Sequence, residues 1–176
     1  VYQKTNGDII YCGDHITPKS TLESQNIGIS TVYQEVNLCA NLSVAENIYI
    51  GREPRTRFGT IDWGTMEQRS KKLLQEALGI DIDVTKLLSF YPVAMQQMIA
   101  IARAIDTRCK ILILDEPTSS LSERETEKLF EIMRNLKSTG ISIIFISHFL
   151  EQIYTICDRI TILRDGNYVG EYEIDK

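Results

Sequence analysis

Two adjacent carboxylates follow an uninterrupted aliphatic run at residues 111–118, Ile-Leu-Ile-Leu-Asp-Glu-Pro-Thr. The run predicts a strand buried on both faces, as in a parallel sheet. Asp115 and Glu116 would then lie at its carboxyl end, where open α/β sheets bind their ligands. Two neighbouring acids at that place suit a magnesium ion and an attacking water. The alternative is a core strand that simply ends in an acidic turn.

Polar side chains also follow two further predicted strands. Gln34 comes directly after residues 27–33, and His148 directly after residues 141–147. Because parallel strands bring their carboxyl ends to one edge of a sheet, both are expected to lie beside the two acids. Together these side chains match the needs of phosphoryl transfer: holding magnesium, orienting water and stabilising developing charge. Taken alone, Gln34 is better explained as a polar strand end and His148 as a hydrogen-bonded structural histidine.

Composition narrows the function classes. The 176 residues suffice for one domain with a core, and 43% hydrophobic and 24% charged residues are ordinary for a globular protein. A net charge of −5 argues against a nucleic-acid binder and gives no support for electrostatic binding to anionic lipid. Four scattered cysteines and two histidines argue against a zinc site and fit a reducing cytosol.

The sequence predicts neither a membrane span nor a signal peptide. The longest apolar runs, residues 111–114 and 143–146, are far too short to cross a bilayer. The sequence begins with Val-Tyr-Gln-Lys, as if within a longer sequence pattern, and has no initiator methionine. We therefore expect it to be an excised piece of a longer chain.

The first part of the chain predicts short elements. Residues 8–11 are typical of a strand that opens an edge hairpin, and residues 20–25 of a short helix. Residues 41–50 predict a loop that leads into a helix. Residues 51–64 predict an exposed loop with the only basic cluster, for which a solvated loop is favoured over a binding patch.

Longer helices follow. Thr65 and Gln68 match a capping box, and the helix behind them is expected to end at Gly79. Residues 93–105 are apolar nearly all round and predict a buried helix, with Pro92 at its first position.

The last third of the chain predicts helices between strands. Ser122 and Glu125 match a second capping box, for a helix that ends at Gly140. Residues 159–164 and 168–172 predict a terminal pair of strands. The alternation of strands and helices indicates an α/β fold with a mostly parallel sheet. Three sets of residues are predicted to face inward from the helices: Leu73, Leu74, Ala77 and Leu78; Leu129, Ile132, Met133 and Leu136; Leu150, Ile153, Tyr154 and Cys157.

Five motifs in this order resemble the ATP-binding cassette of ABC transporters, over essentially the whole chain. Residues 31–38 look like the Q-loop, 111–116 like the Walker B strand with its catalytic glutamate, 119–122 like the D-loop and 146–148 like the switch histidine. Residues 94–104 resemble the signature helix. The resemblance implies a P-loop NTPase core, in which a mostly parallel sheet is flanked by helices, with an α-helical subdomain and an antiparallel edge hairpin.

Short sequence segments within and between these motifs resemble carbohydrate importers whose ATPase carries two fused cassettes, and in particular their first cassette. Residues 33–38, 45–48, 51–53 and 93–98 carry this similarity, and residues 148–154 resemble the galactofuranose and simple-sugar branch. The resemblance implies a subunit that binds and hydrolyses ATP with Mg²⁺ to energise sugar import. It also implies a place on the cytoplasmic face of the membrane, and no nucleic-acid partner. The partners would be a second cassette, permease subunits and, indirectly, a periplasmic or extracellular sugar-binding protein.

The resemblance also implies roles for single residues. Glu116, His148 and Gln34 would be catalytic, and Asp115 with Gln34 would hold the metal. The residues implied to contact nucleotide from the signature helix and the D-loop are Ala94, Met95, Gln96 and Ser120.

The same resemblance divides the cassette into three parts. Residues 1–37 would form the edge strand and the Q-loop strand, residues 38–108 the helical subdomain, and residues 109–176 the remaining core. The permease contact is expected within residues 38–64, with three residues facing it: Asn37, Leu38 and Leu42. Packing of the helical subdomain explains these three residues equally well.

The sequence departs from the family in two places. The phosphate loop, G-x-x-x-x-G-K-[ST], is absent, and so is the aromatic residue that stacks on adenine. This chain alone is therefore expected to be inactive, and its open strand edges are expected to invite self-association. In the signature, Pro92 replaces a serine whose hydroxyl contacts the γ-phosphate, and Ala94 replaces a glycine. One composite ATP site is expected to be weakened, although the amides of Ala94 and Met95 remain.

Two other classes of protein stay open at this point. DNA-repair and chromosome-structure ATPases share the cassette, but they carry long coiled-coil insertions and basic surfaces, which this sequence lacks. A non-catalytic interaction module fits the chain as it stands. For the parent protein, Glu116 and His148 argue against it, because a degenerate cassette is expected to lose one of them.

Overall fold

Three parallel strands form the sheet that positions the candidate site. The computed structural model describes residues 4, 6–34 and 37–174. The strands are β3 (Ile29–Val32), β4 (Ile111–Asp115) and β5 (Ser142–Ile146), with β4 in the middle. Val32 pairs with Leu114, and Asp115 pairs with Ile146, so all three strands point the same way. The predicted parallel sheet of an α/β fold is confirmed.

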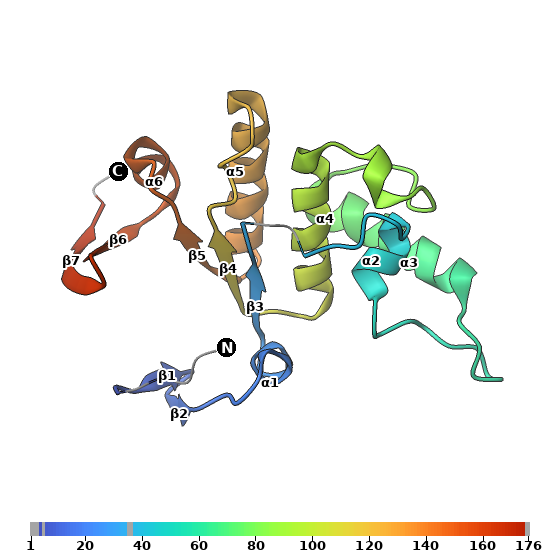
Figure 1. The fold of residues 1–176 in the computed structure, drawn as a ribbon, viewed down its shortest axis with the longest axis horizontal. Coiled ribbons are helices and arrows are strands. Elements are labelled where there is room, and N and C mark those ends of the chain that lie inside the picture. Colours follow the sequence, from blue (N-terminus) through green and yellow to red (C-terminus); the bar gives the residue numbers. More distant parts are fainter. Residues whose placement is uncertain (1–3, 5, 35–36, 175–176) are drawn as a thin grey trace.

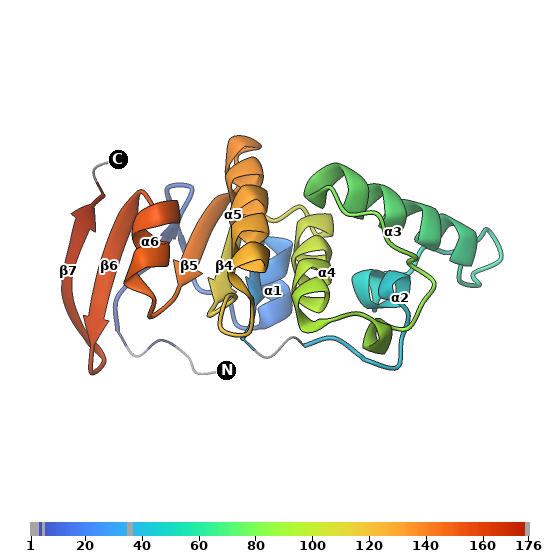
Figure 2. The ribbon, with the colours of Figure 1, turned by 90° about the horizontal axis from the view of Figure 1, so that it is seen from above.

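Two helices cover one face of this sheet, α4 (Val93–Asp106) and α5 (Glu123–Ser138). Figure 2 shows α5 in front of β4, with α4 beside it. Leu112 and Leu114 are fully buried on this face. The ring of Phe130 on α5 meets that of Phe145 on β5 edge to face, with centroids 6.0 Å apart. Part of the core therefore fills the space between these helices and the sheet.

The opposite face of the sheet is only partly covered. In β4, Ile111 and Ile113 are half-buried. In β5, Ile144 is 49% exposed and Ile146 is 45% exposed. The run at residues 111–114, predicted to be buried on both faces, is therefore fully buried on one face and only half-buried on the other, because the helix on this second face, α1 (Thr21–Asn26), packs mainly against β3 (Figure 2). An aliphatic run without alternation does not reveal which face lacks a cover.

A group of helices lies beside the sheet. It comprises α2 (Val44–Tyr49), α3 (Trp63–Leu78), the 3-10 turn η1 (Leu88–Phe90) and α4. Figure 1 shows α2 and α3 on the far side of α4 from the sheet. Asn47 on α2 is buried, and its amide donates to the carbonyl oxygens of Cys39 and Ser43, each at 2.9 Å. This bond network fixes the chain that leads into α2.

The helix ends differ from two predictions. The N-cap of α3 is Asp62, whose carboxylate accepts from the amide of Thr65 at 3.0 Å, so the predicted Thr65 capping box is wrong. Pro92 is the N-cap of α4 rather than its first helical residue. The Ser122 capping box of α5 and the left-handed Gly79 at the end of α3 are confirmed.

The chain ends add two hairpins and two short helices. Strands β1 (Ile9–Tyr11) and β2 (Asp14–Ile16) form the expected antiparallel hairpin, followed by α1 (Thr21–Asn26). Helix α6 (Leu150–Ile156) leads into the antiparallel pair β6 (Arg159–Arg164) and β7 (Asn167–Glu173). The inward stripe on α5 is confirmed, since all four of its residues are buried. On α6 only Ile153 is buried, so the prediction that Leu150 and Tyr154 face inward is wrong.

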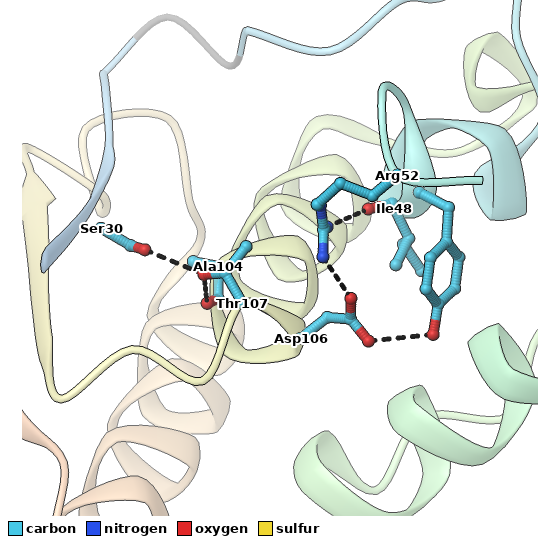
Figure 3. A network of polar contacts seen from close by, with 7 residues as sticks. Ser30, Ile48, Arg52, Ala104, Asp106 and Thr107 are labelled. Atoms are coloured by element: carbon cyan, nitrogen blue, oxygen red, sulfur yellow. Dashed lines mark hydrogen bonds and ion pairs between the residues drawn. The ribbon is translucent and has the colours of Figure 1, made fainter. Parts of the chain in front are cut away.

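A polar network joins α2, α4 and the sheet (Figure 3). The Tyr49 hydroxyl donates to Asp106 Oδ1 at 2.9 Å, and the Arg52 guanidinium donates to Asp106 Oδ2 and to the carbonyl oxygen of Ile48. At the end of α4, Thr107 shares a hydrogen bond of 3.1 Å with Ser30 on β3. The network therefore holds the end of α4 against both neighbours.

The Tyr49–Asp106 bond should make stability depend on pH in the alkaline range. Burial, and then the hydrogen bond to Asp106, raise the pKa of Tyr49 from 10.0 to about 12. Between these pH values the unfolded chain loses a proton that the folded chain keeps, so this contribution is complete below about pH 10 and is lost as pH rises toward 12. We expect the free energy of unfolding to fall more steeply across this window in the wild type than in Tyr49→Phe. Urea unfolding at several pH values checks this. The control Tyr154→Phe, at an exposed position, should follow the wild type. Equal slopes of the free energy of unfolding against pH for all three proteins would contradict the prediction.

Candidate functional site

The predicted site residues gather at the carboxyl edge of the three-stranded sheet. Asp115 is the last residue of β4, Gln34 lies two residues beyond the end of β3, and His148 lies two residues beyond the end of β5. Because the strands are parallel and in register, all three ends lie along one edge, with the two acids in the middle. The sheet thus places the side chains as the sequence order predicts.

Glu116 is the most constrained of these residues. Its φ of 46° is in the left-handed region, which a residue with a side chain adopts only when its surroundings hold it there. Its amide donates to the carbonyl oxygen of Ile146 at 3.0 Å, so the link to β5 continues past the last residue of β4. This backbone turns the side chain out of the strand pattern and aims it along the edge toward His148.

The carboxylate of Glu116 contacts His148 directly. Glu116 Oε1 lies 2.8 Å from His148 Nδ1. The other oxygen, Oε2, is buried and has no hydrogen-bond partner among the described residues. A buried acceptor without a partner is costly. Such an acceptor suits a site that receives a water or another donor during its work.

The histidine also makes a ring contact with the next residue in the chain. The imidazole of His148 and the ring of Phe149 have centroids 4.1 Å apart at an interplanar angle of 37°. The imidazole is also more exposed than the carboxylate, with 67% of its side chain accessible against 18% for Glu116. With Nδ1 engaged by Glu116, Nε2 is the nitrogen that can meet a ligand from solvent.

Asp115 has the features of a ligand for a hard cation but not of a complete metal site. It is half-buried at the end of the central strand. Within the described part of the chain, no group of three or more His, Cys, Asp or Glu side chains could hold a metal ion. Mg²⁺ is commonly bound through one or two carboxylates, with water and substrate phosphates completing its shell. Asp115 beside Glu116 fits that kind of shared coordination.

The turn after Glu116 is tied to α6. The amide of Ser119 donates to the carbonyl oxygen of Glu116 at 3.2 Å, and buried Thr118 donates its hydroxyl to Gln152 Oε1 at 2.7 Å. Sequence reasoning missed Thr118 and Gln152, although Gln152 lies only four residues after His148. Ser120 is exposed in the same turn and makes no side-chain hydrogen bond among the described residues.

The beginning of α4 uses some of its own polar groups. Pro92 offers no side-chain cap, and its carbonyl oxygen accepts from the amides of Met95 and Gln96 at 2.9 and 3.0 Å. The Gln96 side chain donates to the carbonyl oxygen of Tyr91 at 2.8 Å. The amide of Ala94 makes no hydrogen bond within the described chain. Of the two amides expected to meet a ligand, only that of Ala94 lacks an acceptor.

The structure therefore joins some predicted residues and leaves others apart. Glu116 and His148 are in direct contact. In the described part of the chain, no hydrogen bond links Gln34 or the beginning of α4 to that pair. Gln34 lies in an exposed bend beyond β3. The arrangement can hold a water beside a carboxylate with a histidine next to it, which is the geometry needed for general-base hydrolysis.

Known proteins resemble this chain over nearly its whole length. The family model described as ABC transporter matches residues 1–119. The galactofuranose transporter ATP-binding protein YtfR of Escherichia coli (strain K12) is 51% identical over 170 residues, which cover 97% of this chain and 34% of that protein. The ribose import ATP-binding protein RbsA 1 of Rubrobacter xylanophilus is 47% identical, covering 99% and 34%. The fructose import ATP-binding protein FruK of Bifidobacterium longum is 51% identical, covering 97% and 33%. The chain spans about a third of the length of these relatives.

Solved structures share the fold. The ADP conformation of MJ1267, an ATP-binding cassette of an ABC transporter, superposes with a TM-score of 0.82 at 20% identity, covering 98% of this chain and 71% of that one. The ATP-binding cassette MJ0796 bound to ADP and Pi gives 0.79 at 21% identity, covering 99% and 76%. At this level of identity the likeness establishes the architecture alone.

Proposed function

We propose that this chain, which belongs to the ABC transporter family, forms part of a subunit that binds and hydrolyses ATP to energise sugar import. The observation that carries the proposal is the contact of 2.8 Å between Glu116 Oε1 and His148 Nδ1 at the end of the central strand. The names of the similar proteins, which refer to galactofuranose, ribose and fructose, support a sugar as the cargo.

In this proposal Glu116 is the general base. Its buried Oε2 receives the proton of the attacking water, while His148 holds Oε1 and keeps the carboxylate in place. Asp115 is the proposed ligand of Mg²⁺, which neutralises phosphate charge when it is bound with ATP. Gln34 is proposed to reach the same metal and water from the end of β3. Family membership supports nucleotide binding in general, and these single roles are our assignment.

A second cassette is proposed to complete the nucleotide site. Ala94, Met95, Gln96 and Ser120 would contact ATP held mainly by that partner. The free amide of Ala94 supports this role, whereas the amide of Met95 already has an acceptor in Pro92. Pro92 supplies neither a hydroxyl nor an N–H, so we propose that this composite site is the weaker of two.

We propose further that the subunit lies on the cytoplasmic face of the membrane, bound to permease subunits and, through them, to a sugar-binding protein. No helix in the described ranges has the length and apolarity needed to cross a bilayer. Within the proposed helical subdomain, residues 38–108, the permease contact is assigned to residues 38–64. Asn37, which directly precedes this segment, is exposed and could reach the permease, whereas Leu38 packs against the core.

The open side of the sheet should cause self-association of the 176-residue chain. The half-exposed Ile144 and Ile146 lie on β5, which pairs with β4 along one edge only in the described structure. An unpaired apolar strand is a template for pairing with another chain. We expect light scattering to give a mass above that of the monomer, and Ile144→Lys to lower it. A monomer at all concentrations would contradict this proposal.

Hydrolysis coupled to its partners tests the proposed function. The full-length protein is reconstituted with its permease and binding protein in liposomes, and ATPase activity is measured with and without candidate sugars. We expect Mg²⁺-dependent hydrolysis that one sugar stimulates. Hydrolysis that no sugar changes would contradict the transport role, and stimulation by DNA would favour a repair-type ATPase.

A further inference from the structure

A second cross-link lies just behind the contact between Glu116 and His148. The hydroxyl of Thr118 donates to Gln152 Oε1 at 2.7 Å and so joins the turn after β4 to helix α6. Thr118 follows Glu116 by two residues, and Gln152 follows His148 by four. The two cross-links therefore connect the same two segments of the chain.

The two cross-links differ in their exposure to water. Thr118 is 4% exposed, whereas 67% of the His148 side chain is accessible. An exposed charged pair holds its members weakly, because water competes for both of them. A buried hydroxyl has no water to replace a lost acceptor, so breaking its hydrogen bond costs more. The bond between Thr118 and Gln152 is therefore the stronger constraint on where α6 lies relative to the end of β4.

Helix α6 depends on this bond because little else anchors it. In the described structure, Ile153 is the one buried side chain of α6. The amides of Gln152 and Ile153 both donate to the carbonyl oxygen of Phe149, at 3.1 and 3.2 Å, so the first turn of the helix begins directly after His148. A displacement of Gln152 would be passed through this single turn to the imidazole.

The turn on the other side of the bond is held at several points. The amide of Ser119 donates to the carbonyl oxygen of Glu116 at 3.2 Å, and the amide of Leu121 donates to that of Thr118 at 3.1 Å. Pro117, between Glu116 and Thr118, is buried and has a restricted φ. The Thr118 hydroxyl is thus a fixed donor, against which α6 is placed.

We propose that Thr118 and Gln152 are positioning residues, which hold α6 so that His148 Nδ1 stays within hydrogen-bond distance of Glu116 Oε1. This inference rests on the proposed function, in which Glu116 is the general base. Neither Thr118 nor Gln152 touches ATP, and both act on the rate through the orientation of the Glu116 carboxylate. Orientation matters because a misplacement of about 1 Å can cost about 100-fold in rate.

Steady-state ATP hydrolysis by the full-length protein tests this inference. Thr118→Val and Gln152→Leu remove the hydrogen bond with little change of shape, and each is expected to lower kcat about 10-fold with little change in KM. Thr118→Ser keeps the hydroxyl and Gln152→Glu keeps an acceptor oxygen, so both should retain about half or more of the wild-type kcat.

Two control variants separate the bond from its surroundings. Thr126 is also a buried threonine, on α5, and Thr126→Val should leave kcat unchanged. Glu151 is exposed beside Gln152 on α6, and Glu151→Leu should also leave kcat unchanged. Thermal unfolding of every variant shows which of them are folded at the assay temperature. If Thr118→Val is not, Gln152→Leu, at a half-buried position, decides the inference alone.

A His148→Ala background distinguishes positioning from a purely structural role. If Gln152 acts by placing the imidazole, His148→Ala/Gln152→Leu should be no slower than His148→Ala alone. A loss of kcat that is equally large with and without the imidazole would overturn the inference. So would a wild-type kcat in Gln152→Leu.

The same measurements keep this inference apart from the proposed function. A retained kcat in Glu116→Gln would defeat the proposed function itself. A large loss in Glu116→Gln together with an unchanged kcat in Thr118→Val and Gln152→Leu would defeat only the positioning role.

Discussion

Replacing Glu116 with Gln in the full-length protein is expected to lower kcat for ATP hydrolysis by about 10²–10⁴-fold, the usual contribution of a general base. The amide has nearly the shape of the carboxylate and can still bond to His148 Nδ1, which lies 2.8 Å from Oε1 in the wild type. What it cannot do is accept a proton at the second position. The loss should therefore appear in kcat, with little change in the affinity for ATP.

The matched control is Glu123→Gln, an exposed acid in the first turn of α5, which should leave kcat unchanged. His148→Ala adds a second test of the same pair. If the histidine acts by holding Glu116, the double variant should be no slower than Glu116→Gln alone. Retention of more than half of the wild-type kcat by Glu116→Gln would contradict the role of the carboxylate.

The 176-residue chain alone is expected to show no ATP hydrolysis. Its sequence contains no G-x-x-x-x-G-K-[ST], the segment that supplies backbone amides, a lysine and a hydroxyl to the phosphates and metal. Each lost charge-assisted hydrogen bond is worth about 1.5–3 kcal/mol. The described structure offers little replacement, since the amide of Met95 at the start of α4 already donates to Pro92.

The measurement is phosphate release at saturating Mg²⁺ and ATP, with the full-length protein as the positive control. The Glu116→Gln form of the 176-residue chain serves as the blank. A rate in the unsubstituted chain that this variant abolishes would contradict the prediction, because it would place a working phosphate site within residues 1–176.

The core of the site was predictable because strand ends obey simple rules. An aliphatic run before two acids predicts β4, and polar residues after neighbouring parallel strands predict one shared edge. Glu116 and His148 were expected on that edge, and they lie in contact. The left-handed backbone of Glu116 was not predictable, since it is imposed by the bond of its amide to Ile146 and by the turn that follows.

The errors share one physical cause, which is that local pattern does not report tertiary neighbours. Ile144 and Ile146 belong to a β-branched run typical of a buried strand, yet one face of the described sheet is open at these residues. Asp62 and Thr65 are both good N-caps, and the choice between them depends on where Trp63 begins the helix. Leu150 and Tyr154 have helical spacing, but only Ile153 of α6 reaches the core.

One measurement tests most directly whether the Glu116 carboxylate catalyses the ATP hydrolysis that drives sugar import. ATP hydrolysis and uptake of a labelled sugar are recorded on the same proteoliposomes, with the wild type and with Glu116→Gln. We expect the wild type to accumulate sugar only when ATP is supplied, and the variant to lose hydrolysis and uptake together. Uptake that persists in the variant after hydrolysis has stopped would contradict this expectation.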